Sequence, residues 1–318
     1  MAPLTSAGPA ITVIGESLID LIEAPQGPPA AHPGGSPANV AVALARLGRS
    51  TELLTQLGDD RYGRLLLDHL RGNGVGLAAG SVLDAPRTSV AATRVDDTGR
   101  ASYTFDIAWH RFPAARVSTA ASCLHLGSLA TVLAPGADDV LAAAWAARPT
   151  ATVSFDPNCR PTLTPDAPAV RPRIAALVAT SDLVKASVED LDWLYPGRSY
   201  QDVAHEWLEQ GVALVAVTLG GDGAWACTRR QQTTVAPCPV VVADTIGAGD
   251  AFTAGLLCAL AEADLLGAGH RADLRAIDDP TLTRVLAFAA RVAALTCTRP
   301  GADPPTRSET HQARRQSG

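Results

Sequence analysis

The chain has 318 residues, of which 47% are hydrophobic and 18% are charged. These proportions exclude a disordered or collagen-like chain, and the length allows two domains or one large α/β domain with an appendage. The formal net charge is −6 at pH 7, and the basic residues gather in no stripe that would neutralise nucleic-acid phosphates. We therefore expect a folded protein that does not bind nucleic acid.

The start of the chain lacks the basic residues and the apolar stretch of a signal peptide, and no run of about 18 apolar residues occurs. We therefore expect a cytoplasmic protein with no membrane partner. The six cysteines are widely separated, which favours buried free thiols over a disulfide framework or a zinc site. The only lysine, Lys185, follows no glycine-rich loop, so the P-loop class of nucleotide-binding proteins is excluded.

Short apolar runs alternate with segments of helical periodicity along most of the chain. After the first run, Ser36 and Pro37 predict the N-cap and the first position of a helix. Such alternation is typical of an α/β protein with a mainly parallel sheet covered by helices. We expect strands at residues 11–15, 51–57, 123–126, 152–156, 183–185 and 213–219, and helices at residues 37–47, 62–70, 251–262 and 282–296.

Three segments depart from this alternation. Residues 88–95 and 100–107 are β-rich and flank a turn sequence at 96–99, which predicts a hairpin inserted in the α/β domain. Residues 224–242 suggest three short strands at an antiparallel edge of the sheet. Residues 303–318 are polar, and we interpret them as a mobile C-terminal tail.

The segment that says most about chemistry is residues 244–252, where a glycine turn opens an apolar helix. First-turn N–H groups have no intrahelical partner, so Gly247, Ala248 and Gly249 are predicted to form an anion site. Asp250 places a carboxylate beside that site, as phosphoryl transfer requires of an aspartate that accepts a hydroxyl proton. The alternative interpretation is that Asp250 or Asp244 only caps the helix.

Residues 244–255 resemble the C-terminal signature of the ribokinase-like carbohydrate kinases, the PfkB family, and residues 34–48 resemble its N-terminal signature. Shorter matches extend the resemblance over nearly the whole chain. The predicted hairpin agrees with it, because this family carries a small β-rich lid over the sugar. The resemblance implies a ribokinase-like α/β kinase domain over residues 1–302, with lid elements at about residues 11–35 and 87–108.

On the sugar side, the resemblance implies that Asp250 takes the proton of a sugar hydroxyl. Asp20, which only accepts hydrogen bonds, and Asn39, which donates and accepts, would hold other hydroxyls. Gly34 and Gly35 would let the sugar approach the backbone. Taken without the resemblance, Asp20 also fits a solvated strand end and Asn39 an exposed first helical turn.

On the phosphate side, Arg160 follows a buried-strand pattern and is predicted at the carboxyl edge of the sheet. Its guanidinium can bridge phosphates there, and a surface ion pair is the alternative. By resemblance, Thr218, Gly220 and Gly223 belong to the turn that approaches the phosphates of ATP. An ordinary turn between two strands would have a similar composition.

The metal sites are less clearly marked in the sequence. Many relatives have N-x-x-E where this chain has Ser187-Val-Glu189-Asp190. The resemblance links Glu189 and Asp190 to Mg²⁺, which binds mostly through substrate phosphates, whereas Ser187 with Asp190 also fits a helix-capping arrangement. Related kinases are often activated by K⁺, and Asp244 is the candidate ligand here, although it also fits a turn cap.

The resemblance implies an ATP-dependent kinase that uses Mg²⁺ and phosphorylates a primary hydroxyl of a sugar. Residues 33–39 and 156–160 look most like fructokinases and 2-keto-3-deoxygluconate kinases, so fructokinase is the first hypothesis, with the ketodeoxygluconate enzyme and ribokinase as alternatives. A dinucleotide-dependent oxidoreductase would need a G-x-G-x-x-G that residues 15–20 lack. A non-catalytic sugar-binding protein would not need Asp250. An edge hairpin can pair with another subunit, so a homodimer through the lid is a further hypothesis.

Overall fold

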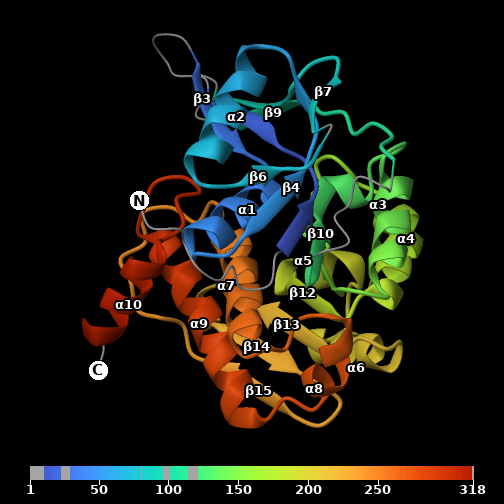
Figure 1. Cartoon of the computed structure of the whole chain (residues 1–318), viewed down its shortest axis with the longest axis vertical. Coiled ribbons are helices and arrows are strands. Elements are labelled where there is room, and N and C mark those ends of the chain that lie inside the picture. The colour runs from blue at the N-terminus through green and yellow to red at the C-terminus, as the bar shows by residue number, and fades with distance from the viewer. Residues whose placement is uncertain (1–10, 23–28, 80, 96–100, 114–120, 317–318) are drawn as a thin grey trace.

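A nine-stranded sheet organises the computed structural model, which describes residues 11–22, 29–79, 81–95, 101–113 and 121–316 (Figure 1). The strands from β13 to β6 run parallel to their neighbours, and β14 and β15 form an antiparallel edge. In the order of the sheet, the strands are β15 (Gln232–Val235), β14 (Ala224–Cys227), β13 (Leu214–Thr218), β12 (Leu183–Ser187), β11 (Thr152–Asp156), β10 (Cys123–Gly127), β1 (Ile11–Ile14), β4 (Thr51–Leu54) and β6 (Gly76–Leu77).

The central strands are buried on both faces, and every residue of β10 and β11 is inaccessible to solvent or nearly so. A parallel sheet of this kind must be covered by helices on both sides. The α/β class predicted from the alternation is therefore confirmed. The strand expected at residues 51–57 is divided in two: the chain leaves the main sheet after Leu54, and β5 (Leu57–Gly58) pairs with β7 (Val82–Ala85).

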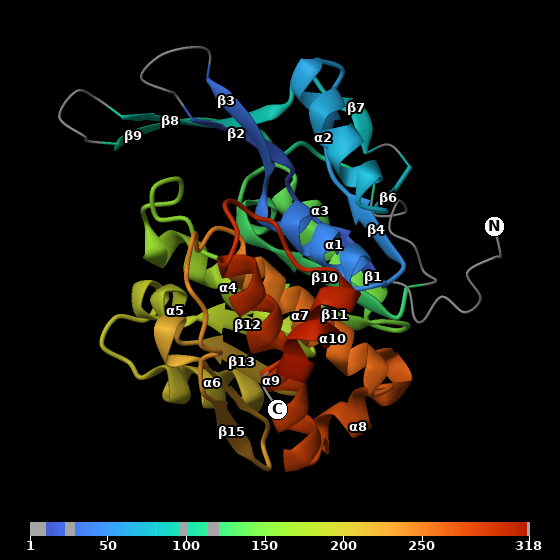
Figure 2. The same ribbon diagram turned by 90° about the vertical axis from the view of Figure 1, so that its left-hand side faces the viewer.

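Helices cover the two faces of the sheet (Figures 1 and 2). One core contains apolar residues of α1 (Ser36–Arg46), α7 (Ala248–Glu262), α8 (Arg271–Arg275) and α9 (Asp279–Cys297). The other contains residues of α3 (Ala137–Ala147), α4 (Ala167–Thr180), α5 (Val188–Leu194) and α6 (Tyr200–Glu209). Gly255 allows α7 and α9 to pack closely, since a Cβ atom there would lie 2.9 Å from Ala289 Cα. Three 3-10 turns are η2 (Ser128–Thr131), η3 (Gly220–Asp222) and η4 (Ala268–His270).

A second, four-stranded sheet projects from one end of the main sheet (Figure 2). Its order is β3 (Ala30–Gly34), β2 (Leu18–Ile22), β8 (Ser89–Val95) and β9 (Ala101–Asp106), and α2 (Arg61–Gly72) packs against it. β8 and β9 pair antiparallel, as the predicted hairpin requires, and its turn at 96–99 lies outside the described residues. The lid element expected at residues 11–35 is shorter in the structure, because β1 belongs to the main sheet and the lid strand starts at Leu18.

The segment interpreted as a polar tail differs from that expectation. It contains α10 (Arg307–Gln316), whose Arg307 forms an ion pair with Glu262 of α7. Thr310 is only 2% exposed, and Arg299 Nη2 lies 2.5 Å from Glu309 Oε1. These contacts join α10 to α7 and to the segment after α9, which the polar composition alone does not indicate.

Two further differences concern the predicted elements. Of the three short strands expected at residues 224–242, the described chain forms β14 and β15, and the segment that follows continues without strand pairing. None of the helices in the described ranges is both long enough and apolar enough to cross a membrane.

Candidate active site

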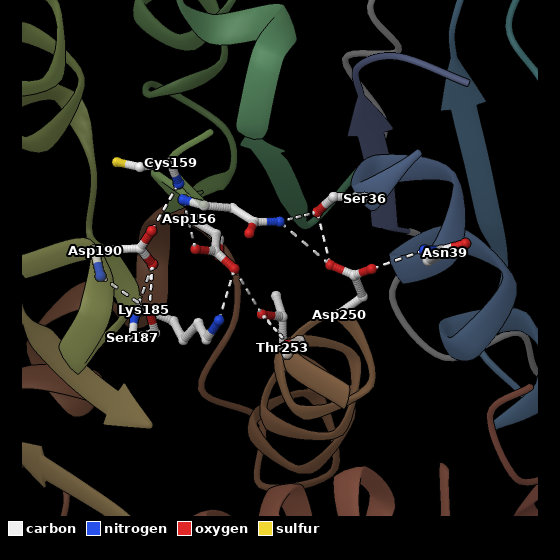
Figure 3. Close-up of polar contacts among 12 residues, drawn as sticks. Ser36, Asn39, Asp156, Cys159, Lys185, Ser187, Asp190, Asp250 and Thr253 are labelled. Atoms are coloured by element: carbon white, nitrogen blue, oxygen red, sulfur yellow. Dashed lines mark hydrogen bonds and ion pairs between the residues drawn. The ribbon is translucent and has the colours of Figure 1, made fainter. Parts of the chain in front are cut away.

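The candidate site lies at the carboxyl edge of the main sheet, where β10, β11 and β12 end and α7 begins (Figure 3). Ligands of open α/β sheets bind at this edge. Two cavities meet there. The cavity of about 420 Å³ is lined by Asp20 and Asp250, and we call it the sugar-side cavity. The cavity of about 410 Å³ is lined by Thr218 and Gly220, and we call it the phosphate-side cavity. Asn158, Thr245 and Gly249 line both. A ligand in one cavity therefore reaches the border of the other at the start of α7.

The turn before α7 depends on a glycine. Gly247 is the N-cap with a φ of 75°, and a Cβ atom there would lie 2.7 Å from Ala302 Cβ. Ala248 N–H donates to the Thr245 carbonyl within the turn. Gly249 and Asp250 occupy first-turn positions, whose N–H groups lack an intrahelical acceptor and carry the positive end of the helix dipole. Of the three predicted anion-site residues, Ala248 thus has its N–H group engaged within the turn, whereas Gly249 has its N–H group in the first helical turn.

Asp250 is held by two side chains of α1 (Figure 3). Ser36 Oγ donates to Asp250 Oδ1 at 2.7 Å, and Asn39 Nδ2 donates to Asp250 Oδ2 at 2.8 Å. Asp250 is 7% exposed and lines the sugar-side cavity. Its side chain does not cap α7, because the N-cap is Gly247 without a side-chain cap bond.

The predicted N-cap role of Ser36 is wrong. Gly35, with a φ of 99°, is the N-cap of α1, and Ser36 is the first helical residue. A Cβ atom on Gly35 would lie 2.6 Å from the Glu16 carbonyl oxygen, so the close approach of two segments sets where the helix begins. The Ser36 hydroxyl is thereby directed to Asp250. A serine before a proline at a helix start matches the N-cap pattern, so no local signal marks this contact.

Asn158 connects the two sides of the site and was not predicted. Its Nδ2 donates to Ser36 Oγ at 2.6 Å, and its Oδ1 accepts a hydrogen bond from Arg160 Nη1 at 2.6 Å. The residue has a φ of 37°, which is uncommon outside glycine and recurs at functional sites. Arg160 is exposed and lines the sugar-side cavity, whereas its sequence position predicts a place at the phosphates.

The sugar-side cavity contains most of the predicted sugar residues. Asp20, Gly35 and Asn39 line it, and Phe105 of β9 lines it from the lid. Burial raises the pKa of Asp20 above its ordinary value. Gly34 does not line the cavity; a Cβ atom on it would lie 2.2 Å from Asp20 Oδ2, so Gly34 makes room for that carboxylate.

The phosphate-side cavity combines a glycine-containing turn with apolar walls. Its lining includes the residues predicted to form one turn near the phosphates of ATP, namely Thr218, Gly220 and Gly223. Gly223 has a φ of 96°, and a Cβ atom on it would lie 2.2 Å from the Val235 carbonyl oxygen. The apolar walls are formed by Val240, Val242, Phe252, Ala290, Ala293 and Ala294.

Asp190 and Glu189 have different surroundings. Asp190 forms a capping box with Ser187 at the start of α5, and its Oδ1 accepts a hydrogen bond from Cys159 N–H at 2.7 Å. Both oxygens of Asp190 are therefore engaged by the protein, as its capping interpretation requires. Glu189 is exposed and lines the phosphate-side cavity.

Asp244 connects two loops near the start of α7. Its Oδ1 accepts from Ile246 N–H at 3.0 Å, and its Oδ2 accepts from Gly301 N–H at 2.8 Å. These hydrogen bonds hold the pKa of Asp244 below its ordinary value. No group of three or more His, Cys, Asp or Glu side chains that could hold a metal ion occurs in the described part of the chain.

A charged pair is buried behind the anion turn. Lys185 Nζ lies 3.0 Å from Asp156 Oδ2, and the two side chains are 4% and 2% exposed. Thr253 Oγ1 also donates to Asp156 Oδ2, at 3.3 Å. Burial raises the pKa of Asp156 to about 6, against the opposing effect of the Lys185 charge. Lys185 ends the strand predicted at residues 183–185, and no local sequence signal marks its ion pair.

Residues 9–309 match the model of the pfkB family carbohydrate kinases, and the chain belongs to this family. A glycine-opened helix at the border of two cavities, with a carboxylate that lines one of them, is consistent with that class of enzyme. The resemblance inferred from the two signatures is confirmed. The oxidoreductase hypothesis is excluded by the same match.

Individual relatives are fructokinases. The chain is 34% identical over 269 residues to the fructokinase of Rhizobium leguminosarum bv. trifolii, which covers 80% of this chain and 81% of that protein. The structure is similar to the fructokinase of Xylella fastidiosa with bound ATP, with a TM-score of 0.87 and 30% identity over 97% of this chain and 99% of that one. A fructokinase double mutant from Vibrio cholerae O395, in a fructose, ADP and potassium ion bound form, has a TM-score of 0.81 and 28% identity over 96% and 99% of the two chains.

Proposed function

We propose that this carbohydrate kinase transfers the γ-phosphoryl group of ATP to a primary hydroxyl of fructose. The observation that carries the proposal is the meeting of two cavities at the start of α7, where Gly249 borders both and Asp250 lines one. A sugar in one cavity and ATP in the other would bring hydroxyl and phosphate together at the positive end of a helix. The similarity to fructokinases supports the choice of sugar.

In this mechanism Asp250 takes the proton of the sugar hydroxyl as the hydroxyl oxygen attacks the γ-phosphorus. A new O–P bond forms, the bond between the γ-phosphorus and the bridging oxygen breaks, and ADP leaves with that electron pair. Ser36 and Asn39 orient the carboxylate through its two oxygens. N–H groups of the first turn of α7, with Gly249 foremost, stabilise the negative charge on the transferred group.

The other ligands of the sugar are proposed from the lining of the sugar-side cavity. Asp20 accepts hydrogen bonds from hydroxyls remote from the transferred phosphate, and Asn39 Oδ1 accepts from another while its Nδ2 holds Asp250. Gly35 lets the sugar approach the backbone. Arg160 lies at the exposed side of the cavity, where its charge can attract the phosphorylated product.

ATP fits the phosphate-side cavity. Its apolar walls suit a flat base, and the turn with Thr218, Gly220 and Gly223 suits the phosphates. Mg²⁺ supplies charge neutralisation when bound to the phosphates, and it needs few protein carboxylates. Glu189 is the carboxylate on this wall that we assign to the metal, because Asp190 is engaged in its capping box.

We also propose a K⁺ site beside Asp244. Asp244 joins the turn of residues 244–247 to Gly301, so a cation held there would fix the turn that carries the anion site. Replacing Na⁺ by K⁺ at constant ionic strength is expected to raise turnover. An equal rate in the two salts would refute activation by K⁺.

A coupled ADP-release assay over a sugar panel tests the function. Fructose is expected to give a higher kcat/KM than ribose, 2-keto-3-deoxygluconate, tagatose or nucleosides. Omission of the sugar controls for ATP hydrolysis. A higher value for 2-keto-3-deoxygluconate or ribose would replace the proposed substrate, and an absence of turnover with every sugar would favour a non-catalytic binding protein.

A further inference from the structure

Lys185 is the only lysine in the chain, and it is buried at the candidate active site. Its side chain extends from β12 toward Asp156, which accepts a hydrogen bond from Nζ at 3.0 Å (Figure 3). Burying an ammonium group is unfavourable unless partners replace the lost water. All other Lys or Arg positions in this chain hold arginine. A buried lysine at this one position therefore indicates a specific role for its ammonium group.

The ammonium group lies against the anion turn. A Cβ atom built on Gly249 would be 3.3 Å from Lys185 Nζ, and both residues line the phosphate-side cavity. An ammonium has three N–H donors. Within the described residues its hydrogen-bond partner is Asp156, so two donors remain for a ligand in that cavity.

The charges around Lys185 keep it cationic. Burial lowers the pKa of Lys185, but Asp156, Asp190 and Asp250 together outweigh this effect and raise it above the ordinary value. A triphosphate at the start of α7 would bring more negative charge to a region that already holds these three carboxylates. A fixed cation at this point reduces that repulsion most strongly where water is excluded.

We propose that Lys185 is a catalytic residue that binds the γ-phosphate of ATP and stabilises its charge as it passes to the sugar. Asp156 is a positioning residue, which holds Nζ beside Gly249 through the ion pair. The bonds formed and broken are those of the transfer to the sugar hydroxyl, with its proton going to Asp250. This inference rests on the proposed binding of ATP in the phosphate-side cavity.

The competing explanation is that Lys185 only neutralises Asp156. Buried ion pairs often tolerate replacement of both partners by uncharged groups, whereas removing one partner leaves an uncompensated charge. The double variant Lys185→Met/Asp156→Asn therefore separates the two roles. A purely structural pair predicts recovery of both stability and activity relative to Lys185→Met alone.

Our proposal predicts recovery of stability without recovery of activity. In Lys185→Met/Asp156→Asn, kcat is expected to fall about 10²- to 10³-fold, as for loss of one donor to a transition-state oxyanion. Calorimetric titration is expected to show weaker binding of a non-hydrolysable ATP analogue and nearly unchanged binding of ADP. A folded double variant with near wild-type kcat, or with equal losses for the two nucleotides, would overturn the proposal.

A second measurement needs no variant. Because the chain has one lysine, protein labelled with [¹³Cε]lysine and carrying a lysine-free tag gives one side-chain resonance. This resonance is expected to shift further with the Mg²⁺ complex of the ATP analogue than with that of ADP. Identical shifts in the two complexes would overturn the proposal even if the variants do not fold.

Failure of this inference can be distinguished from failure of the proposed function. Binding of both nucleotides to the wild-type protein and turnover of fructose test the function directly. If both are observed and the Lys185 resonance does not distinguish the nucleotides, only the role of Lys185 is wrong. If no nucleotide binds, both proposals fail together.

Discussion

Asp250 has both carboxylate oxygens engaged by donors from α1, which lies 211 and 214 residues away in sequence at the two contacts. These donors hold the carboxylate in one orientation at the start of α7. A side chain that merely capped α7 would not need them.

The first prediction concerns this carboxylate. Asp250→Asn preserves size and can keep hydrogen bonds to α1, but an amide cannot take the hydroxyl proton, so kcat is expected to fall about 10²- to 10⁴-fold. Dissociation constants for sugar and ATP, measured by calorimetry, are expected to change little. Near-normal turnover in a folded variant would remove Asp250 from the mechanism.

The second prediction separates sugar binding from catalysis. Asp20→Ala removes a charged acceptor worth about 1.5 to 3 kcal/mol, so sugar affinity is expected to fall by one to two powers of ten, with ATP affinity within about threefold of wild type. Asn39→Ala serves as the comparison and is expected to lower kcat as well, because Asn39 also holds Asp250. Unchanged sugar affinity in Asp20→Ala would place the sugar elsewhere.

At the scale of elements, the projecting four-stranded sheet of β3, β2, β8 and β9, which we call the lid sheet, forms part of the wall of the sugar-side cavity. Phe105 and Ile107 line that cavity, and Ala91 of β8 lines it from the paired strand. A layer that contacts the ligand but belongs to a separate sheet can close over the site and exclude water. A homodimer formed through the edges of this sheet stays a prediction.

The third prediction is that sugar binding closes the lid. Backbone amides of residues 87–108 are expected to exchange more slowly with solvent when sugar is present, because closure protects them. Hydrogen exchange with and without sugar, followed by mass spectrometry, measures this. Equal exchange in both states, with α9 as an internal reference, would contradict a moving lid.

At the scale of the whole molecule, stability is coupled to pH through Glu16. This residue follows β1, is 4% exposed, and accepts a hydrogen bond from Ala130 N–H at 3.0 Å. Burial raises the pKa of Glu16 to about 7. A carboxyl with a raised pKa in the folded state stabilises the fold at low pH, and that contribution is lost as pH rises toward 7.

The fourth prediction follows from this sign. Between pH 4.5 and 8, the free energy of unfolding of the wild type is expected to fall by about 3 kcal/mol relative to Glu16→Gln, since each pKa unit corresponds to about 1.4 kcal/mol. Urea denaturation of both proteins at the two pH values measures the difference. A constant difference between them would show that the Glu16 carboxyl does not titrate in this range.

The sequence by itself determined the α/β class, the lid hairpin, the family and the position of Asp250 directly after a glycine turn. Each depends on a signal contained in a short window: the alternation of strand and helix patterns, the turn residues of a hairpin, or a glycine turn that opens a helix. Gly247 illustrates this, because its positive φ belongs to the local turn and favours glycine there.

The tertiary structure alone decided what surrounds Asp250. In sequence, Ser36 matches an N-cap pattern, Asn158 matches an ordinary loop, and Lys185 matches a buried strand. These residues come together only because α1, β11, β12 and α7 meet at one edge of the sheet. Likewise, α10 is polar in sequence and is placed by ion pairs with Glu262 of α7 and with Arg299, which follows α9. Such contacts join residues far apart in the chain, so they depend on packing of the whole sheet and leave no periodicity or spacing to detect.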